Sequence, residues 1–522
     1  MIRSSDLASS SIGGVLDFAS MLGVTMKSVV LGVLFVLCLV EVACAQPPAG
    51  QAPSKQSGHP ATASSETSGF ALPNSSAKPW TGDYDGMVKR RRIRFLVPYS
   101  KTYYFVDRAV QRGLAYDMTR IFETDLNKRH KTGHLRIDVV CIPVARDEMI
   151  PALLAGRGDV VVGNLTITAE RLKHVDFTNP FRRNVSEVVV TGPSAAPIVS
   201  LDDLAGKEIY VRKSSSYYES LEKLNQELAR AKKPPVRIRL APETLEAEDI
   251  LEMVNAGLVK MTIAETYLGE FWRQIFPKLT VHAGIVVRTG ADIAWMIRKQ
   301  SPQLMTELNA FLTRMEKSGL RNELLQRYYQ STRFVKSATS KDELAKFERM
   351  VTLFHKYGTK YDIEYLLLMA QGYQESELNQ SKRSPVGAIG VMQVMPSTGR
   401  EMRVGDINEV EPNIHAGVKF LRAMMNDYYA NEPMDQLNKG LFAFASYNAG
   451  PGRIRQLRKI AAQRGLDPNV WFNNVELVAA EKIGRETVTY VSNIYKYYLA
   501  YQLIEEERAE RQRAKEAIKQ GG

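Results

Sequence analysis

Residues 374–378 read Gln-Glu-Ser-Glu-Leu, and residues 384–396 read Ser-Pro-Val-Gly-Ala-Ile-Gly-Val-Met-Gln-Val-Met-Pro. The run Ile363–Ala370 leads directly into the first stretch and is apolar almost all round, which is typical of a buried helix. Glu375 follows Gln371 by four residues, so both are expected on one face near the end of this helix. Burial and the negative end of the helix dipole both disfavour a charged carboxylate and raise its pKa. The stretch therefore predicts a general acid that works near neutral pH.

A glutamate at a helix end is, on its own, more often a solvated residue. The surrounding sequence adds further motifs. Gly387 and Gly390 allow tight turns that bring the backbone close to the carboxyl group. Two more runs follow in order: Ala445-Ser446-Tyr447-Asn448-Ala449-Gly450-Pro451-Gly452 and Glu486-Thr487-Val488-Thr489-Tyr490-Val491. Together the four motifs resemble the lytic transglycosylase domain of the soluble-transglycosylase, goose-lysozyme-like type, and a four-part pattern is a stronger indication than one short motif.

This resemblance implies a particular reaction on peptidoglycan. Ordinary glycosidases use two carboxylates that flank the scissile bond. The resembling family uses one, so Glu375 would protonate the glycosidic oxygen of the MurNAc-GlcNAc β-1,4 bond and then take the proton of the C6 hydroxyl as it attacks C1. The product would be a 1,6-anhydroMurNAc end, made without water. The enzyme would be a lyase, and the sequence leaves open whether it acts in exo or endo fashion.

The resemblance also implies a set of substrate-binding residues. Ser384, Met392 and Gln393 match positions that line the saccharide cleft, and Tyr447 and Tyr490 match tyrosines near the acid. A phenol there can orient the carboxyl group and stack on a sugar. Each of these residues could instead be a packing residue. Glu377 is expected to be structural because it lies two positions after Glu375 on the helix, and Asn448 is expected to shape its turn.

The C-terminal part is predicted to be all-α. From Glu343 onward the pattern indicates helices at 343–357, 361–377, 414–429, 439–447, 453–463 and 486–504, without a convincing strand. A lysozyme-like catalytic domain is therefore expected at about residues 345–500, followed by a charged helical tail at 505–522.

The N-terminal part alternates strands and helices. Strands are predicted at 93–97, 135–141 and 159–162, with helices at 116–126 and 147–154. A second set has strands at 208–211, 237–240 and 261–263, with helices at 217–231 and 246–256. This alternation predicts parallel βαβ units in two α/β lobes within residues 86–335. A ligand would bind in the cleft at the strand ends.

The runs Leu154–Asp159, Asn164–Arg171, Val175–Pro180 and Leu201–Lys207 resemble the bacterial extracellular solute-binding family that captures amino acids. The resemblance implies a two-lobed, periplasmic-binding-protein-like regulatory domain. By position, Arg171 matches the arginine that grips a ligand carboxylate, for which a guanidinium offers a two-pronged donor. The remaining implied ligand-binding residues are Thr166, Ser214, Ser215, Ser216 and Glu265, the last for an ammonium group. Beside an enzyme, this domain is expected to sense amino acids, muropeptides or stem peptides.

Residues 27–45 resemble an export signal, whereas residues 1–25 fit one poorly. Lys27 precedes the apolar run Val29–Val40, which is short for a membrane span, and Ala43-Cys44-Ala45 suits signal cleavage. A signal peptide is thus expected within residues 1–45, with Met26 as an alternative start. A lipid anchor at Cys44, which would associate the chain with a membrane, is the alternative. Residues 46–85 are predicted to form a flexible Pro/Ser-rich linker, and the location is expected to be the periplasm beside the outer membrane.

Charge and composition indicate which classes of binding partner to expect. The 522-residue chain carries a formal net charge of +12, which suits a polyanionic cell-wall polymer or a membrane surface. Lys89–Arg92 precedes a buried strand in an exported chain, so no nucleic-acid partner is expected. The seven histidines show no zinc-site spacing, and neither a metal nor a cofactor is predicted. Cys141 is expected to be a buried core residue.

Two alternatives to the lyase remain open on the sequence. One is a muramidase of the same fold that uses water. The other is a non-catalytic muropeptide sensor that retains the helical domain, against which the complete motifs argue.

Overall fold

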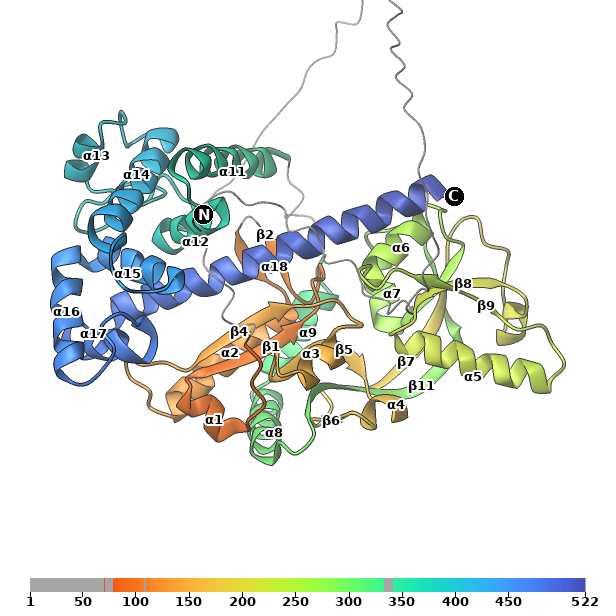
Figure 1. The fold of residues 1–522 in the computed structure, drawn as a ribbon. Coiled ribbons are helices and arrows are strands. Elements are labelled where there is room, and N and C mark those ends of the chain that lie inside the picture. Colours follow the sequence, from red (N-terminus) through yellow and green to blue (C-terminus); the bar gives the residue numbers. More distant parts are fainter. Residues whose placement is uncertain (1–69, 71–77, 108, 333–340, 522) are drawn as a thin grey trace, which may run out of the picture. The chain divides into compact units, whose positions relative to one another are not determined.

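The structure is a computed structural model that describes residues 70, 78–107, 109–332 and 341–521 (Figure 1). The predicted signal peptide, the cleavage site with Cys44 and most of the linker lie outside these residues.

The N-terminal part is built on a 7-stranded mixed sheet with the order β10-β7-β11-β5-β1-β4, with β6 paired to β11. Its strands are β1 (Arg92–Val97), β4 (Asp138–Pro143), β5 (Val160–Thr166), β6 (Val175–Phe177), β7 (Arg182–Thr191), β10 (Met261–Glu265) and β11 (Thr280–Arg298). Two small sheets pair β2 (Phe105–Asp107) with β3 (Val110–Arg112) and β8 (Glu208–Arg212) with β9 (Arg237–Ala241).

The expectation of parallel βαβ units is correct for part of this sheet and wrong for the rest. β1 runs parallel to β4 and β5, and β8 runs parallel to β9. However, β7 and β11, which the sequence pattern did not reveal, run antiparallel to their neighbours. The first half of β11 is a mixture of exposed and partly buried residues and the second half is mostly buried, so β11 lacks the uniform pattern by which a strand is recognised.

Helices cover this sheet and extend the two lobes (Figure 1). They are α1 (Tyr84–Lys89), α2 (Leu114–Arg129), α3 (Met149–Leu154), α4 (Ala169–Leu172), α5 (Ser216–Arg230), α6 (Ala247–Asn255), α7 (Thr266–Arg273), α8 (Pro302–Lys317) and α9 (Leu320–Tyr329). A large apolar core joins α2, α7 and α8 to the sheet and contains Phe95, Phe122, Trp272, Trp295 and Phe311. Cys141 is buried in this core, as predicted.

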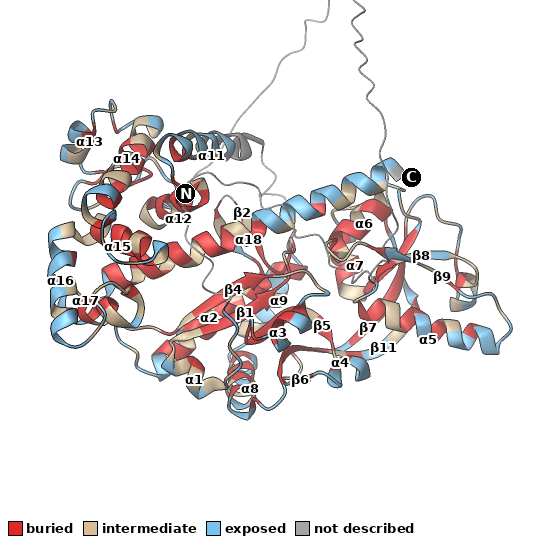
Figure 2. Cartoon of the chain, in the orientation of Figure 1, coloured by how far each residue is buried: buried red, intermediate tan, exposed pale blue. Residues whose placement is uncertain are grey.

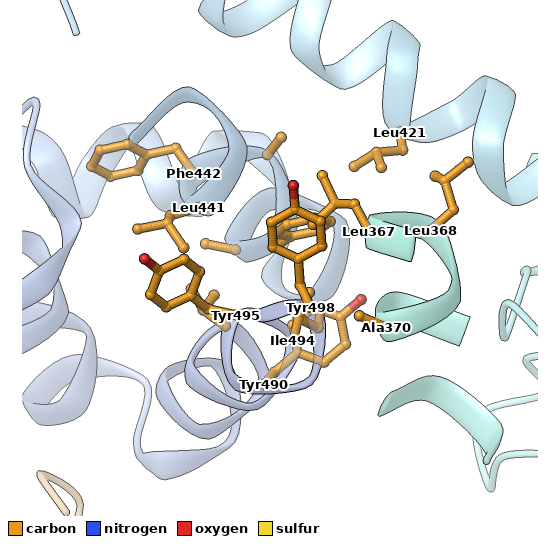
Figure 3. Packing of buried hydrophobic residues seen from close by; sticks show 14 of the residues in the cluster. Leu367, Leu368, Ala370, Leu421, Leu441, Phe442, Tyr490, Ile494, Tyr495 and Tyr498 are labelled. Carbon is orange, nitrogen blue, oxygen red and sulfur yellow. The ribbon is translucent and has the colours of Figure 1, made fainter. Parts of the chain in front are cut away.

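The C-terminal part is helical over its described residues. Its helices are α11 (Lys341–Tyr361), α12 (Tyr365–Ser376), α13 (Pro396–Met402), α14 (Val410–Tyr429), α15 (Gln436–Ala449), α16 (Pro451–Gln463), α17 (Glu476–Lys482) and α18 (Arg485–Gly521). Figure 3 shows the apolar core where α12, α14, α15 and α18 meet, with Leu367, Leu421, Phe442 and Ile494 among its members. The predicted helices agree with α11, α12 and α14–α16 within a few residues, whereas α13 and α17 were not predicted.

The helix α18 is longer than the predicted helix at 486–504, because residues 505–521 continue it. Its first half is largely buried and its second half largely exposed (Figure 2). An exception in the second half is Arg511, which is buried and donates hydrogen bonds to the carbonyl oxygens of Thr244 and Tyr99. Residues 505–521 are mostly charged and lack an apolar face, so the sequence did not indicate that Arg511 would be buried.

Candidate functional site

Glu375 lies in the last turn of α12, where the helix ends in two residues of left-handed conformation, Glu377 and Leu378 (φ 57° and 60°). Its Oε1 accepts a hydrogen bond of 2.6 Å from the hydroxyl of Tyr490 on α18. Burial raises the pKa of Glu375 to about 7, and the charge of Glu486 raises it further, while the Tyr490 hydrogen bond and Lys382 oppose this rise. Glu375 is thus a carboxyl group that can be protonated or ionised near neutral pH.

A buried glutamine stands behind this pair. Gln371 is fully buried, and its Nε2 donates a hydrogen bond of 3.3 Å to the Tyr490 hydroxyl oxygen. Its Oε1 has no hydrogen-bond partner among the described residues. The direction of donation therefore runs from Gln371 to Tyr490 and from Tyr490 to Glu375. No role was expected for Gln371 from the sequence, although a glutamine in an apolar run four residues before the acid is a usable signal.

The loop at 384–395 is held by its own polar groups. Ser384 Oγ accepts a 2.9 Å hydrogen bond from the amide of Ala388, and Gln393 Nε2 donates to the carbonyl oxygen of Gly390 at 2.9 Å. Gly390 has a φ of 77°, and a Cβ on it would lie 2.5 Å from Gln380 Oε1 and 2.6 Å from Asn413 Nδ2. Glycine is thus required here. Ser384 and Gln393 both make contacts that shape this loop.

Met392 is fully buried in the apolar core of the helical domain. Its backbone carbonyl accepts a 2.9 Å hydrogen bond from the Tyr447 hydroxyl. The structure therefore brings Tyr490 into direct contact with Glu375, whereas Tyr447 bonds to the loop. The charge of Glu375 is nevertheless near enough to add to the rise in the pKa of Tyr447, which is caused mainly by burial.

Two further residues lie close to this site. Glu377 is exposed and is the left-handed C-cap residue of α12. Asn448 was expected to shape its turn, but its Oδ1 accepts a 2.7 Å hydrogen bond from Thr487 and so links α15 to α18.

The N-terminal part contains a small polar cavity of about 40 Å³. Of the residues predicted to bind a ligand, Arg171, Ser214, Ser215, Ser216 and Glu265 line it. Thr166 does not line it, but its carbonyl oxygen accepts a 2.8 Å hydrogen bond from Arg171. The other end of the Arg171 guanidinium donates to the carbonyl oxygen of Ser214 at 2.9 Å. Burial lowers the pKa of Arg171 to about 10.

The polar groups of this cavity largely satisfy one another. Ser216 donates to Glu187 at 2.6 Å, and Glu265 accepts hydrogen bonds from Tyr217 and, at 3.3 Å, from Asn164. Burial raises the pKa of Glu265. A cavity of this size holds only about one or two water molecules, so a ligand would have to displace some of these internal contacts.

An ion pair missed by the sequence analysis closes one side of the cavity. Arg146 donates from Nε and Nη2 to the Glu246 carboxylate at 2.8–3.0 Å, and Arg212 lies 3.6 Å from it. Burial opposes ionisation of Glu246, but the two arginines outweigh it and hold its pKa at about 2. Arg146 directly precedes the predicted helix at 147–154, and Glu246 begins the predicted helix at 246–256. Their positions at helix starts were therefore readable from the sequence, although their pairing was not.

Comparison with known proteins identifies both parts of the chain. Residues 97–331 match the model of the bacterial extracellular solute-binding proteins, family 3, and residues 352–469 match that of the transglycosylase SLT domain.

Similar proteins over most of the chain include those named membrane-bound lytic murein transglycosylase F. The one from Desulfosudis oleivorans is 26% identical over 78% of this chain and 89% of its own length. The one from Shewanella woodyi is 28% identical over 77% of this chain and 82% of its own length.

Among solved structures, an ancestral amino acid-binding protein, AncCDT-1, is 22% identical over 47% of this chain and 98% of its own, with a TM-score of 0.39. The substrate-binding protein AbpA from Streptococcus pneumoniae, solved with L-arginine, is 17% identical over 49% of this chain and 100% of its own, with a TM-score of 0.41.

Among the residues that the structure describes, no helix is long and apolar enough to cross a membrane. The two matched domains stand in the same chain, and the similar proteins span both of them. The chain is therefore similar over most of its length to the membrane-bound lytic murein transglycosylases F, its solute-binding region precedes its transglycosylase region, and it is a lyase that acts on peptidoglycan.

Proposed function

We propose that the enzyme cleaves the MurNAc-GlcNAc β-1,4 bond without water and leaves 1,6-anhydroMurNAc ends, with Glu375 acting first as acid and then as base. The observation that carries this proposal is the Glu375 carboxyl group, which has a pKa of about 7, accepts a hydrogen bond from a tyrosine and forms no ion pair among the described residues. A group poised near neutral pH can give up a proton and take one back within one turnover.

Each step needs only this group and the substrate. In the first step, the bond between C1 of the muramic sugar and the glycosidic oxygen breaks, and the Glu375 proton moves to that oxygen. The 2-acetamido group of the sugar stabilises the positive charge that develops at C1. In the second step, the C6 oxygen forms a bond to C1 and its proton returns to Glu375, so no water is consumed.

Tyr490 and Gln371 support this cycle from behind the carboxyl group. The Tyr490 hydroxyl donates to one Glu375 oxygen, which leaves the other oxygen to serve the substrate. That hydrogen bond favours the ionised form, while burial favours the neutral form. The balance holds the pKa of Glu375 near the pH at which both forms are populated.

The reaction is tested on purified peptidoglycan sacculi, with mass spectrometry of the released fragments. An anhydro end is lighter than a hydrolysed end by one water molecule. The wild type should release anhydro fragments, and Glu375→Gln should release none although it still unfolds cooperatively on heating. Glu377→Gln is the matched control, because that carboxyl group is exposed and lies only two residues away in the sequence. An active Glu375→Gln variant would refute the assignment.

A muramidase of the same fold that uses water is the second candidate, and Glu486 is the observation that favours it. Its charge acts on Glu375, and α18 carries it one turn before Tyr490. A hydrolytic enzyme would need such a second carboxylate to activate water. Fragments that carry one extra water, and that disappear in Glu486→Gln, would support hydrolysis over the lyase reaction.

We further propose that the N-terminal cavity senses an amino acid or the end of a stem peptide. Arg171 and Arg146 can bind a carboxylate, and Glu265 can bind an ammonium group, after the ligand has displaced the internal contacts. Calorimetry with free amino acids and muropeptides should show binding that Arg171→Gln weakens. A wild type that binds neither class of compound would rule the sensing role out.

We also propose that the protein is exported to the periplasm and associated with the outer membrane, with a signal peptide in residues 1–45 and a linker at 46–85. The relatives named membrane-bound support this location. The proposed domains are 86–335 for the sensing part and 345–500 for the catalytic part, with a charged segment at 505–522. A mass spectrum of the mature N-terminus separates plain cleavage from acylation of Cys44.

A further inference from the structure

The N-terminal part has a second cavity, which is much larger than the sensing cavity. It lies between α7 and α9 and has a volume of about 460 Å³, which falls in the range of small-molecule sites. Its lining includes the rings of Tyr267, Phe271 and Tyr329 and the side chain of Arg182, the first residue of β7. Neither the reaction at Glu375 nor the sensing cavity uses Arg182.

Arg182 is held in place without an anionic partner. Its guanidinium carbon lies 3.8 Å from the ring centroid of Tyr267 and 5.2 Å from that of Tyr329. Among the described residues, no carboxylate forms an ion pair with Arg182. In the sensing cavity, by contrast, Arg146 pairs with Glu246, and Arg171 donates to two carbonyl oxygens. The donors of Arg182 are therefore available to a ligand, and stacking on Tyr267 orients their planar fork.

The rest of the lining indicates which ligand fits this cation. Four amide side chains stand around the cavity, those of Gln274, Asn322, Gln326 and Gln330. Glu270 also lines it, and its carboxylate forms an ion pair with Arg273 at 2.5 Å. Each amide offers both a donor and an acceptor, which complements the N–H and C=O groups of a peptide bond. The side chains of Phe271 and Leu325 provide an apolar surface for small side chains. A guanidinium, flanking amides and an apolar wall together suit the carboxylate end of a short peptide.

Tyr267 separates the two cavities. One face of its ring carries Arg182, and its hydroxyl donates a 2.7 Å hydrogen bond to Asn164, which lines the sensing cavity. Asn164 also donates to Glu265, the residue proposed to bind an ammonium group. The two cavities thus share a wall but offer different cations, Arg171 in one and Arg182 in the other.

We propose that the cavity between α7 and α9 is a second binding site, in which Arg182 binds the terminal carboxylate of a short peptide. The site does not require an ammonium group on the ligand, whereas the proposed sensing cavity does. A peptide with a blocked N-terminus and a free C-terminus therefore distinguishes the two sites.

The test is calorimetry on the full chain with N-acetyl-trialanine and with its C-terminal amide. The wild type should bind the free acid at one site, and the amide at least tenfold more weakly. Arg182→Gln should weaken binding of the acid at least tenfold, and Arg182→Lys should weaken it less, because a lysine keeps the charge but loses the fork. Arg183→Gln is the matched control, since Arg183 is the exposed neighbour.

Arg171→Gln should leave binding of the acetylated peptide unchanged, even where it weakens binding of free amino acids in the sensing cavity. This result is therefore independent of the sensing proposal. Thermal unfolding of each variant reports whether it is folded. The comparison of N-acetyl-trialanine with its C-terminal amide is made on the wild type and does not depend on any variant. Three results would overturn the proposal: no binding of the acid by the wild type at about 10 mM, equal binding of acid and amide, or full binding by a folded Arg182→Gln variant.

Discussion

Glu375, which is partly buried, and Glu246, which is buried, stand in the two parts of the same chain, and their pKa values lie on opposite sides of the ordinary value although both carboxyl groups are desolvated. Glu375 accepts a hydrogen bond from Tyr490, and burial raises its pKa to about 7. Glu246 is paired with Arg146 and Arg212, and its pKa is held at about 2 despite burial. The difference shows that burial alone does not make an acid. A neutral hydrogen-bond partner leaves the carboxyl group able to exchange a proton, whereas a buried arginine fixes it as an anion.

Removing the exchangeable carboxyl group should have the largest effect. Glu375→Gln keeps the shape of the side chain and a hydrogen-bonding oxygen for Tyr490, but it carries no transferable proton. We expect the rate of release from sacculi to fall by about 10³-fold or more, as for loss of a general acid. A fall of less than about tenfold, measured with correctly folded protein, would mean that another group supplies the proton.

Removing the cation from the other carboxylate tests the opposite case. Arg146→Met leaves Glu246 buried with Arg212 alone, and breaking a buried ion pair from one side costs about 3–5 kcal/mol. The free energy of unfolding in urea should fall by this order at pH 7. Arg157→Met is the control, because Arg157 and Glu148 form a pair that is about half exposed, and such pairs contribute about 0–1 kcal/mol. Equal losses in the two variants would contradict the comparison.

The raised pKa of Glu375 should also appear as a stability difference. In the unfolded chain this carboxyl group ionises near 4.5, and in the folded chain near 7. Below pH 4.5 the Glu375 carboxyl group is protonated in both the folded and the unfolded state, so its ionisation does not change the free energy of unfolding. Between these values only the unfolded state ionises, so folding is progressively destabilised, by up to about 3 kcal/mol above pH 7.

Glu375→Gln should therefore be more stable than the wild type at pH 8, by up to about 3 kcal/mol, and equal to it at pH 4. Urea unfolding at the two pH values measures this directly. Glu377→Gln, at an exposed position, should show no such pH-dependent gain. A gain that is the same at both pH values would point to packing and not to ionisation.

The sequence predicted one of the two glutamate environments much better than the other. The apolar run before Glu375 identified α12 and the raised pKa, because helix periodicity and burial are local properties of the sequence. Tyr490 was found only through its motif, since it lies 115 residues away from Glu375. The Arg146–Glu246 pair spans 100 residues and belongs to no motif, so only the folded chain could reveal it. The same limit explains the antiparallel strands β7 and β11, whose partners are distant in sequence.

Changing Tyr490 should shift the pH dependence of the reaction. The Tyr490 hydroxyl stabilises the ionised form of Glu375, so Tyr490→Phe should raise the pKa of Glu375 above about 7. The alkaline limb of the pH-rate profile, where the acid loses its proton, should then move to higher pH, and the rate should fall by about tenfold. Tyr447→Phe is the control, because that hydroxyl bonds to the carbonyl oxygen of Met392. An alkaline limb that moves equally in both variants would argue against the direct hydrogen bond.

Gln371 should give the smallest effect, because it acts on Glu375 only through Tyr490. Its amide donates to the Tyr490 oxygen, which makes the hydroxyl a better donor to Glu375. Gln371→Leu removes this donor, so the alkaline limb should move in the same direction as in Tyr490→Phe but less far. In the double variant with Tyr490→Phe, Gln371→Leu should add no further shift, since the hydroxyl through which it acts is gone. Additive shifts would show that Gln371 reaches the carboxyl group by another route, such as packing around α12.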